Sequence, residues 1–294
     1  MNTCLVTGSA GFVGNYLKNE LEKQGHQVIG YDIKDGLTLT NYEQLRWFLD
    51  KDRPDYIYHL AAQAFVGESF GDPNRTIDVN IKGTINLLEA VRNLGIRPKI
   101  LLACSSEEYG HVEPDECPIN ENNPLRPMSP YGISKVACDM LGDWYSKQYG
   151  LHIVRTRAFN HTGKDRGEMY VTSSFAKQIA QIEKYGGVLK HGNLDAIRDF
   201  TDVRDMVKAY ILAINLEPDV YNIGSGIGIT IQRVLDILNS IGVKTELDPS
   251  RVRKTEVPRL VCDCSKFYKL TGWKPTIKIE QTLSDLLEDW RSKV

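Results

Sequence analysis

A tyrosine and a lysine near the middle of the chain are spaced so that they could act as one acid–base pair. Tyr131 and Lys135 lie four positions apart in the segment SPYGISK, where we predict that a helix begins. This spacing puts both side chains on one helical face. An ammonium group beside a phenol favours the phenolate and lowers the phenol pKa toward neutral pH. The pair could therefore exchange a proton with a carbonyl or a carbinol oxygen.

Two serines follow an apolar run, ILLAC, at residues 100–104. We predict a strand there, and side chains just beyond a strand of a parallel sheet reach the edge where ligands bind. Ser105 could hydrogen-bond the same oxygen as Tyr131, and Ser106 lies next to it. Helix capping or turn formation would explain the two serines equally well.

Three glycines stand between a predicted strand and a predicted helix, in TGSAGFVG at residues 7–14. Gly8 permits a tight turn, Gly11 lets the backbone approach a pyrophosphate, and Gly14 lets the helix pack closely on the sheet. The free N–H groups and the dipole of a helix N-terminus attract phosphates. We predict a dinucleotide site, with a merely tight turn as the alternative; its residues in this segment would be Gly8, Gly11, Phe12, Val13 and Gly14.

Asp32 ends the second predicted strand, 18 residues after Gly14. A carboxylate at this point can accept hydrogen bonds from both hydroxyls of the adenosine ribose, and it would repel a 2′-phosphate. Asp32 therefore favours NAD(H) as the cofactor. Lys34 could partly offset the repulsion, so NADP(H) remains possible, and a solvated aspartate at a strand end is the alternative interpretation.

Strand-like and helix-like segments alternate through the first half of the chain, which predicts βαβ units and an α/β fold with a doubly wound parallel Rossmann sheet. The predicted strands are residues 3–7, 27–32, 55–61, 99–104 and 151–157, with a very short one at 37–39. The predicted helices are residues 12–23, 42–49, 76–94 and 134–149.

The pattern changes after about residue 159, where loops lengthen, and we predict a second, smaller α/β region that packs on the first. Its predicted helices are residues 173–184, 203–215, 231–241 and 283–291, and its strands are 188–191 and 220–223. We expect a Rossmann domain over residues 1–162, to which segments near 200–224 return, and a substrate-binding domain mainly over residues 163–294.

Composition limits the kinds of partner and the cellular compartment that we expect for this chain. The 294 residues carry 36 Lys and Arg against 38 Asp and Glu, a formal net charge of −2, so we expect no nucleic-acid partner. The chain shows neither a signal peptide nor an apolar stretch long enough to cross a membrane, so we expect no membrane partner. Six scattered cysteines predict free thiols in the cytoplasm and no metal site.

Four motifs together resemble a known family, the extended short-chain dehydrogenase/reductases that act on nucleotide sugars. TGSAGFVG, HLAAQ (59–63), CSSEEYG (104–110) and YGISK (131–135) match in order and spacing. The resemblance implies that Ser105, Tyr131 and Lys135 are catalytic and that Lys135 also holds the nicotinamide ribose. It implies a structural role for Asn80 and cofactor contacts from Leu60, Ala61 and Ala62, and from Tyr131 and Lys135 themselves.

The second half resembles the GDP-mannose branch, and most closely the GDP-6-deoxy-4-keto-mannose reductases that form GDP-rhamnose. The matching segments are FNH (159–161), GNLDAIRDFTDVRD (192–205), YNIGSG (221–226), RKTEVPRL (253–260) and TGWKP (271–275). The resemblance implies a GDP-sugar substrate bound by Ser106, Asn160, Thr172, Lys177, Arg198, Arg253 and Glu256. Arginines can fork onto a diphosphate, and Glu256 can accept the paired N–H donors of guanine.

Three reactions stay open. A reductase would add hydride and a proton at C4 of a GDP-4-keto-6-deoxy sugar. A GDP-mannose 4,6-dehydratase would use Glu107 as the base at C5, although Glu107 and Glu108 could equally form an acidic loop. A 4-epimerase would oxidise and then reduce C4 with retained NAD. The resemblance further implies a homodimer formed through the helices at 76–94 and 134–149.

Overall fold

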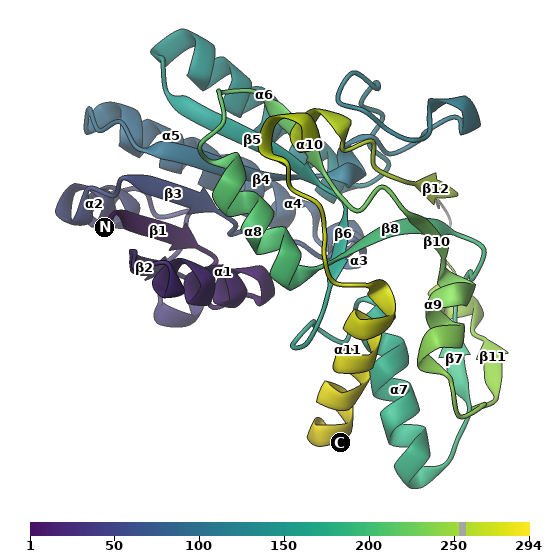
Figure 1. Cartoon of the computed structure of the whole chain (residues 1–294). Coiled ribbons are helices and arrows are strands. Elements are labelled where there is room, and N and C mark those ends of the chain that lie inside the picture. Colours follow the sequence, from purple (N-terminus) through teal and green to yellow (C-terminus); the bar gives the residue numbers. More distant parts are fainter. Residues whose placement is uncertain (253–256) are drawn as a thin grey trace.

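A six-stranded parallel sheet forms the centre of the larger part of the molecule (Figure 1). The computed structural model describes residues 1–252 and 257–294. The sheet order is β2-β1-β3-β4-β5-β9. The strand order reverses at β1, because β2 lies on one side of β1 and all later strands lie on the other. The strands are β1 (Thr3–Thr7), β2 (Gln27–Tyr31), β3 (Tyr56–His59), β4 (Lys99–Ser105), β5 (His152–Ala158) and β9 (Val220–Ile223).

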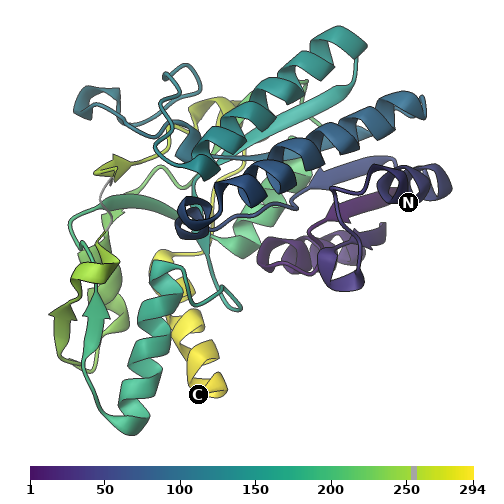
Figure 2. The same ribbon diagram turned by 180° about the vertical axis from the view of Figure 1, so that it is seen from behind.

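Helices cover both faces of this sheet, which confirms the predicted doubly wound fold. One face carries α1 (Phe12–Lys23), α8 (Val203–Ala213) and α10 (Ser265–Thr271), seen in front in Figure 1. The other carries α2 (Tyr42–Asp52), α5 (Gly83–Asn93) and α6 (Pro130–Tyr149), seen in front in Figure 2. Each face of the sheet carries its own apolar core, because successive side chains of a strand point to opposite faces. In β1, Cys4 and Val6 pack in the core with α1 and α8, and Leu5 packs in the core with α2 and α5.

Two sequence predictions need correction. No strand forms at residues 37–39, because Gly36 turns the chain at φ +76° after a short 3₁₀ turn, Ile33–Asp35. The predicted helix over 76–94 is helical throughout, as α4 (Pro73–Ile77), a π-helical turn (Asp78–Lys82) and α5, but it begins earlier than predicted, at Pro73. Pro73 starts α4 because its missing N–H needs no partner at that position, and Asp72 accepts a hydrogen bond from the Arg75 amide.

A smaller α/β layer closes the open end of the large sheet (Figure 1). Its strands are β6 (Asn160–Thr162), β8 (Ile197–Asp202), β10 (Gly228–Thr230) and β12 (Arg259–Leu260), with β7 (Leu189–His191) paired to β11 (Thr245–Leu247). The helices α7 (Val171–Tyr185), α9 (Ile231–Leu238) and α11 (Ile279–Lys293) share one apolar core. Between β8 and β9 the chain runs back along α1 as α8, so the two layers are joined more than once. The division at residue 162 remains a prediction.

None of the helices within residues 1–252 and 257–294 has both the length and the apolar character needed to cross a bilayer. The short α3 (Val66–Gly71) precedes α4 and lies against α6. This places the N-terminus of α6 between the end of β4 and the loop after β3, where the side chains discussed next converge.

Candidate active site

The predicted acid–base pair lies at the start of α6. Ser129 caps the helix by accepting a hydrogen bond from the Gly132 amide at 3.0 Å, so Tyr131 falls in the first turn. The side chains of Ser105 and Tyr131 lie beside each other and line one cavity. The Nζ of Lys135 lies 5.9 Å from the centroid of the Tyr131 ring and donates to the Ala103 carbonyl at 2.7 Å. The three predicted residues therefore share one site.

The electrostatics of this site differ from the prediction in one respect. Burial raises the pKa of Tyr131, and the opposing effects of Lys135 and Ser105 do not cancel it. Burial by itself lowers the pKa of Lys135. The neighbouring Tyr131, Cys138 and Cys104 raise the pKa by more than burial lowers it, so the net shift is upward. Tyr131 therefore holds its proton and Lys135 its positive charge at neutral pH, the states required of a proton donor and its adjacent cation.

Asn80 supports the site from the π-helical turn. Its side chain accepts a hydrogen bond from the Gln63 amide at 2.8 Å and donates to the Gln63 carbonyl at 3.1 Å. It also donates to Ser134 Oγ at 2.9 Å, and that hydroxyl donates to the Tyr131 carbonyl. Asn80 thus joins the loop after β3 to the helix that carries Tyr131. Single π turns of this kind are frequent at functional sites.

The glycine-rich turn has the shape that a dinucleotide requires. Gly8 has φ +72°, and a Cβ added there would lie 2.9 Å from the Ala61 Cα. A Cβ on Gly14 would lie 2.1 Å from the Gly8 carbonyl oxygen. No side chain caps the N-terminus of α1 and no acidic residue lies in its first turn, so its N–H groups are open to an anion. These features fit a bound pyrophosphate.

The other predicted cofactor residues lie at the same edge of the sheet. Leu60 and Ala61 follow β3 and donate their amides to the Thr7 carbonyl at 3.3 Å and to Thr7 Oγ1 at 3.2 Å, and Ala62 comes next along the chain. Asp32 is buried and accepts the amides of Ala10 and Lys34, each at 2.9 Å. A carboxylate has about four acceptor positions, so Asp32 can still accept a ribose hydroxyl.

The lysine beside Asp32 does not pair with it. Lys34 Nζ donates instead to the Ala10 carbonyl at 2.9 Å. The Asp32 carboxylate therefore forms no ion pair with the cation nearest to it in the sequence.

The two adjacent glutamates have different surroundings. Glu108 is fully buried, accepts the Ser105 amide at 2.8 Å through Oε1, and lies 3.2 Å from Arg157 Nε through Oε2. Burial is the main reason that the pKa of Glu108 is raised well above its usual value. Glu107 is only partly buried and lines the same cavity as Ser105 and Tyr131. The interpretation of both residues as one acidic loop is therefore wrong.

A cavity of about 470 Å³ opens from Tyr131 toward the smaller layer. A volume of this order suits a ligand of small-molecule size. Three of the predicted substrate residues line it from three elements: Asn160 of β6, Thr172 of α7 and Arg198 of β8. Thr172 is fixed by a 2.7 Å hydrogen bond between its hydroxyl and that of Thr162.

The other predicted substrate residues lie elsewhere. Within residues 1–252 and 257–294, neither Ser106 nor Lys177 lines the cavity. Ser106 is buried beneath the turn, where its carbonyl accepts the Tyr109 amide, and Lys177 forms an ion pair with Glu168. Arg253 and Glu256 lie outside the described residues.

Sequence reasoning missed several side chains that line the cavity: Phe65, His161, Arg166, Tyr170, His191 and Arg251. Arg166 is the most unusual, because its guanidinium carbon lies 3.4 Å from the centroid of the Tyr170 ring and 4.8 Å from that of Phe12. Neither period nor spacing marks Arg166 in the polar segment GKDRGEMY, so only its neighbours in space could identify it.

Comparisons with known proteins agree with this geometry. Residues 34–286 match the family model described as GDP-mannose 4,6 dehydratase. A GDP-6-deoxy-D-mannose reductase of Pseudomonas aeruginosa is 34% identical over 98% of this chain and 97% of its own length.

Solved structures agree over the whole chain. The structure of RMD from Pseudomonas aeruginosa complexed with NADPH has a TM-score of 0.91 and 32% identity, and covers 100% of both chains. A UDP-glucose 4-epimerase of Thermus thermophilus in complex with NAD has a TM-score of 0.90 and 29% identity, and covers 99% of this chain and 100% of that one.

Proposed function

Because this chain belongs to the GDP-mannose 4,6 dehydratase family and is an extended short-chain dehydrogenase/reductase, we propose that it reduces a GDP-4-keto-6-deoxy-mannose-type sugar at C4. The product would be a GDP-6-deoxy sugar such as GDP-rhamnose. The observation that carries the proposal is that Tyr131 and Ser105 lie side by side on the wall of the cavity, with Lys135 beside the phenol.

The residues divide the reaction between them. A bound reduced nicotinamide would supply the hydride that C4 receives. Tyr131 donates its proton to the C4 oxygen, and the Ser105 hydroxyl stabilises the negative charge that develops on that oxygen. Lys135 keeps its charge beside Tyr131 and favours the phenolate left behind. Hydride and proton together convert the ketone to a secondary alcohol.

We further propose how the ligands lie. The glycine turn, Asp32 and residues 60–62 would hold the cofactor on the large sheet. Asn160, Thr172 and Arg198 would hold the sugar nucleotide, with Arg253 and Glu256 as proposed partners of the diphosphate and the guanine. Asp32 favours NAD(H), because its carboxylate follows β2 without an ion pair to Lys34 and would repel a 2′-phosphate. The Pseudomonas relative of known structure was solved with NADPH, so both cofactors belong in the test.

A single pair of assays tests the reaction. GDP-4-keto-6-deoxy-mannose with NADH or NADPH should consume the reduced cofactor, followed at 340 nm. GDP-mannose without added cofactor should stay intact. Loss of water from GDP-mannose would instead establish the second candidate, a 4,6-dehydratase, which is favoured by the position of Glu107 on the cavity wall. Interconversion of 4-epimers with retained NAD, and no net consumption of NADH, would identify an epimerase.

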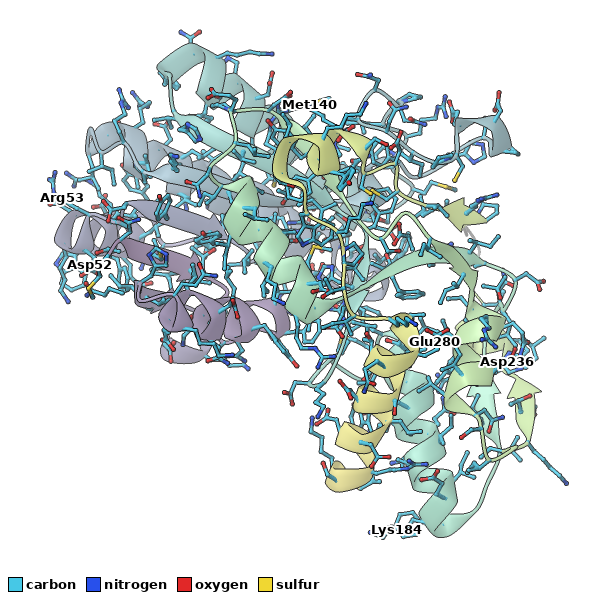
Figure 3. All side chains as sticks on the ribbon, viewed as in Figure 1. Asp52, Arg53, Met140, Lys184, Asp236 and Glu280 are labelled. Carbon is cyan, nitrogen blue, oxygen red and sulfur yellow. The ribbon has the colours of Figure 1, made fainter. Side chains whose placement is uncertain are left out.

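We also propose a homodimer formed through α6 and α4. Ile133, Met140 and Trp144 fall on one face of α6 and are 52%, 61% and 49% exposed, and Ile77 on the neighbouring α4 is 43% exposed. Figure 3 shows Met140 at the outer edge of the molecule. An apolar face of this kind is typical of a surface covered by a partner. Light scattering should give a dimer that Met140→Glu converts to a monomer, whereas Leu212→Glu on α8, also exposed, should not.

We place the protein in the cytoplasm, because all six cysteines are free thiols. Fractionation of the cells that make it, with detection of the native protein, would test that placement. Recovery with a membrane or secreted fraction would contradict it.

A further inference from the structure

Arg166 lies where the smaller layer meets the glycine-rich turn. It belongs to the loop between β6 and α7, and it lines the cavity that also contains Ser105 and Tyr131. Its guanidinium packs between the Tyr170 ring and the Phe12 ring. Phe12 is the first residue of α1 and directly follows Gly11. The cation therefore stands beside the helix N-terminus that we propose binds the cofactor.

The loop holds Arg166 in place from both sides. The Arg166 carbonyl accepts the Ser173 hydroxyl at 2.6 Å, and the Arg166 amide donates to the Gly163 carbonyl at 3.2 Å. The Tyr16 hydroxyl of α1 donates to the Lys164 carbonyl at 3.3 Å, and the Asp165 amide donates to Asp289 of α11 at 3.0 Å. Because these contacts fix the loop, little conformational freedom is lost when a ligand binds the side chain.

Among the residues that the structure describes, the Arg166 guanidinium has no acidic partner. In residues 1–252 and 257–294 no carboxylate forms an ion pair with Arg166, while the neighbouring side chains are aromatic. Arg166 is only partly exposed, and this burial lowers its pKa. A cation in such a place is stabilised when an anion binds next to it. Stacking leaves the donor edges of a guanidinium free to fork onto phosphate oxygens.

We propose that Arg166 binds the diphosphate of the nicotinamide cofactor, as a side-chain partner of the amides at the N-terminus of α1. This inference rests on the proposed function. Two phosphate sources are possible, and position favours the cofactor. Arg198, the arginine proposed for the sugar nucleotide, extends from β8, whereas Arg166 packs on the first residue of α1. NAD(H) and NADP(H) contain the same diphosphate, so Arg166 would recognise the two cofactors alike.

Calorimetry with ADP-ribose, AMP and GDP tests the proposal on the intact protein. ADP-ribose carries the diphosphate without the nicotinamide, AMP has only one phosphate, and GDP reports on the sugar-nucleotide site. Arg166→Gln should weaken ADP-ribose binding about 10- to 100-fold, the range for a lost charge-assisted contact, and leave GDP binding within about twofold. AMP binding should weaken by a smaller factor, because AMP carries only one of the two phosphates. Lys164→Gln, an exposed cation of the same loop, is the matched control and should bind ADP-ribose like the wild type.

Other outcomes overturn the proposal. Unchanged ADP-ribose binding by Arg166→Gln would do so, and so would a selective loss of GDP binding, which would give the cation to the sugar nucleotide. Failure of the wild type to bind ADP-ribose would remove the cofactor site itself, and the proposed function with it. The midpoint of thermal unfolding separates binding from folding: Arg166→Gln should not lower it, because Arg166 forms no ion pair with a carboxylate of residues 1–252 and 257–294. A lower midpoint with ligand affinities unchanged would show a purely structural residue.

Discussion

Arg157 on β5 donates through Nε to Asp139 on α6 at 2.7 Å, and the two side chains are almost completely buried. Asp139 also accepts a hydrogen bond from Arg155 Nη1 at 2.6 Å. Arg155 and Arg157, two residues apart on one face of β5, therefore bind the same carboxylate. That carboxylate lies four residues, about one turn, beyond Lys135. The ion pair therefore sets the position of the helix that carries Tyr131 relative to the strand beside Ser105.

Removal of Asp139 should be strongly destabilising. Asp139→Ala removes the carboxylate that two buried guanidinium groups share, and leaves Arg157 with Glu108 at 3.2 Å and Arg155 with Asp143 at 2.9 Å. We therefore expect the free energy of unfolding to fall by about 3 kcal/mol, the lower end of the range for a broken buried pair. Asp50→Ala removes an exposed partner of Arg53, 2.8 Å away, and should change the free energy of unfolding by about 0–1 kcal/mol. Urea titrations of the two variants measure the difference, and equal losses would contradict this account.

Tyr131 should act as an acid over a wide pH range. Because burial raises its pKa above that of an ordinary phenol, about 10, the hydroxyl stays protonated at and above neutral pH. For reduction, kcat/KM should be flat with respect to this group through neutral pH and decline only in strongly alkaline solution. The pH profile of the wild type is the measurement, and an alkaline decline centred near pH 7 would show that Tyr131 has a lowered pKa instead.

Substitution separates the proton donor from its neighbour. Tyr131→Phe should reduce kcat by about 10²- to 10⁴-fold through loss of the proton donor. Ser105→Ala should reduce it by about 10²- to 10³-fold through loss of a donor to the C4 oxygen. Both variants should still bind the cofactor, which fluorescence titration with NADH or NADPH can check. A Tyr131→Phe enzyme with wild-type kcat would remove Tyr131 from the mechanism.

The two glutamates should respond differently to the same kind of substitution. Glu108→Ala removes the carboxylate that accepts the Ser105 amide and pairs with Arg157, and leaves a buried space in its place. We therefore expect the free energy of unfolding to fall by about 1–3 kcal/mol. Glu107→Gln should change stability by no more than about 0.5 kcal/mol and spare most of a reductase activity. In a 4,6-dehydratase, Glu107→Gln should abolish turnover. Urea unfolding and the two substrate assays together distinguish these outcomes.

His59 should make the fold sensitive to acid. Its ring is buried and hydrogen-bonded to Thr7 at 2.9 Å and Thr84 at 3.0 Å, and burial is the main cause that lowers the pKa of His59 from 6.5 to about 3. Between these values the unfolded chain binds the proton and the folded one does not. The stability is therefore complete above pH 6.5 and is lost as the pH falls toward 3.

The size of this effect can be isolated. Between pH 7 and pH 5 the wild type should lose about 2 kcal/mol more unfolding free energy than His59→Gln, at about 1.4 kcal/mol per pH unit below pH 6.5. Urea titrations of both proteins at the two pH values give the double difference, which cancels the contribution of the other histidines. A double difference near zero would mean that His59 is charged in the folded protein.

Local patterns in the sequence were enough for the parts of the site that one turn or one helix positions. The spacing of Gly8, Gly11 and Gly14 leads to the turn that the structure contains, because a tight turn followed by a helix is a short-range property. Tyr131 and Lys135 share a face of α6 for the same reason. The alternation of strand and helix was likewise enough to predict the doubly wound sheet.

Only the tertiary structure decided which side chains meet across elements. Glu107 and Glu108 are indistinguishable in sequence, yet one lines the cavity and the other lies beneath it, because the 3₁₀ turn after β4 rotates successive side chains apart. Lys177 lies on α7 close to Thr172 in sequence, but an ion pair with Glu168 directs it away from the cavity. Arg166 becomes a candidate only when β6, α1 and α7 are brought together, since packing between distant segments leaves no periodic signal in the chain.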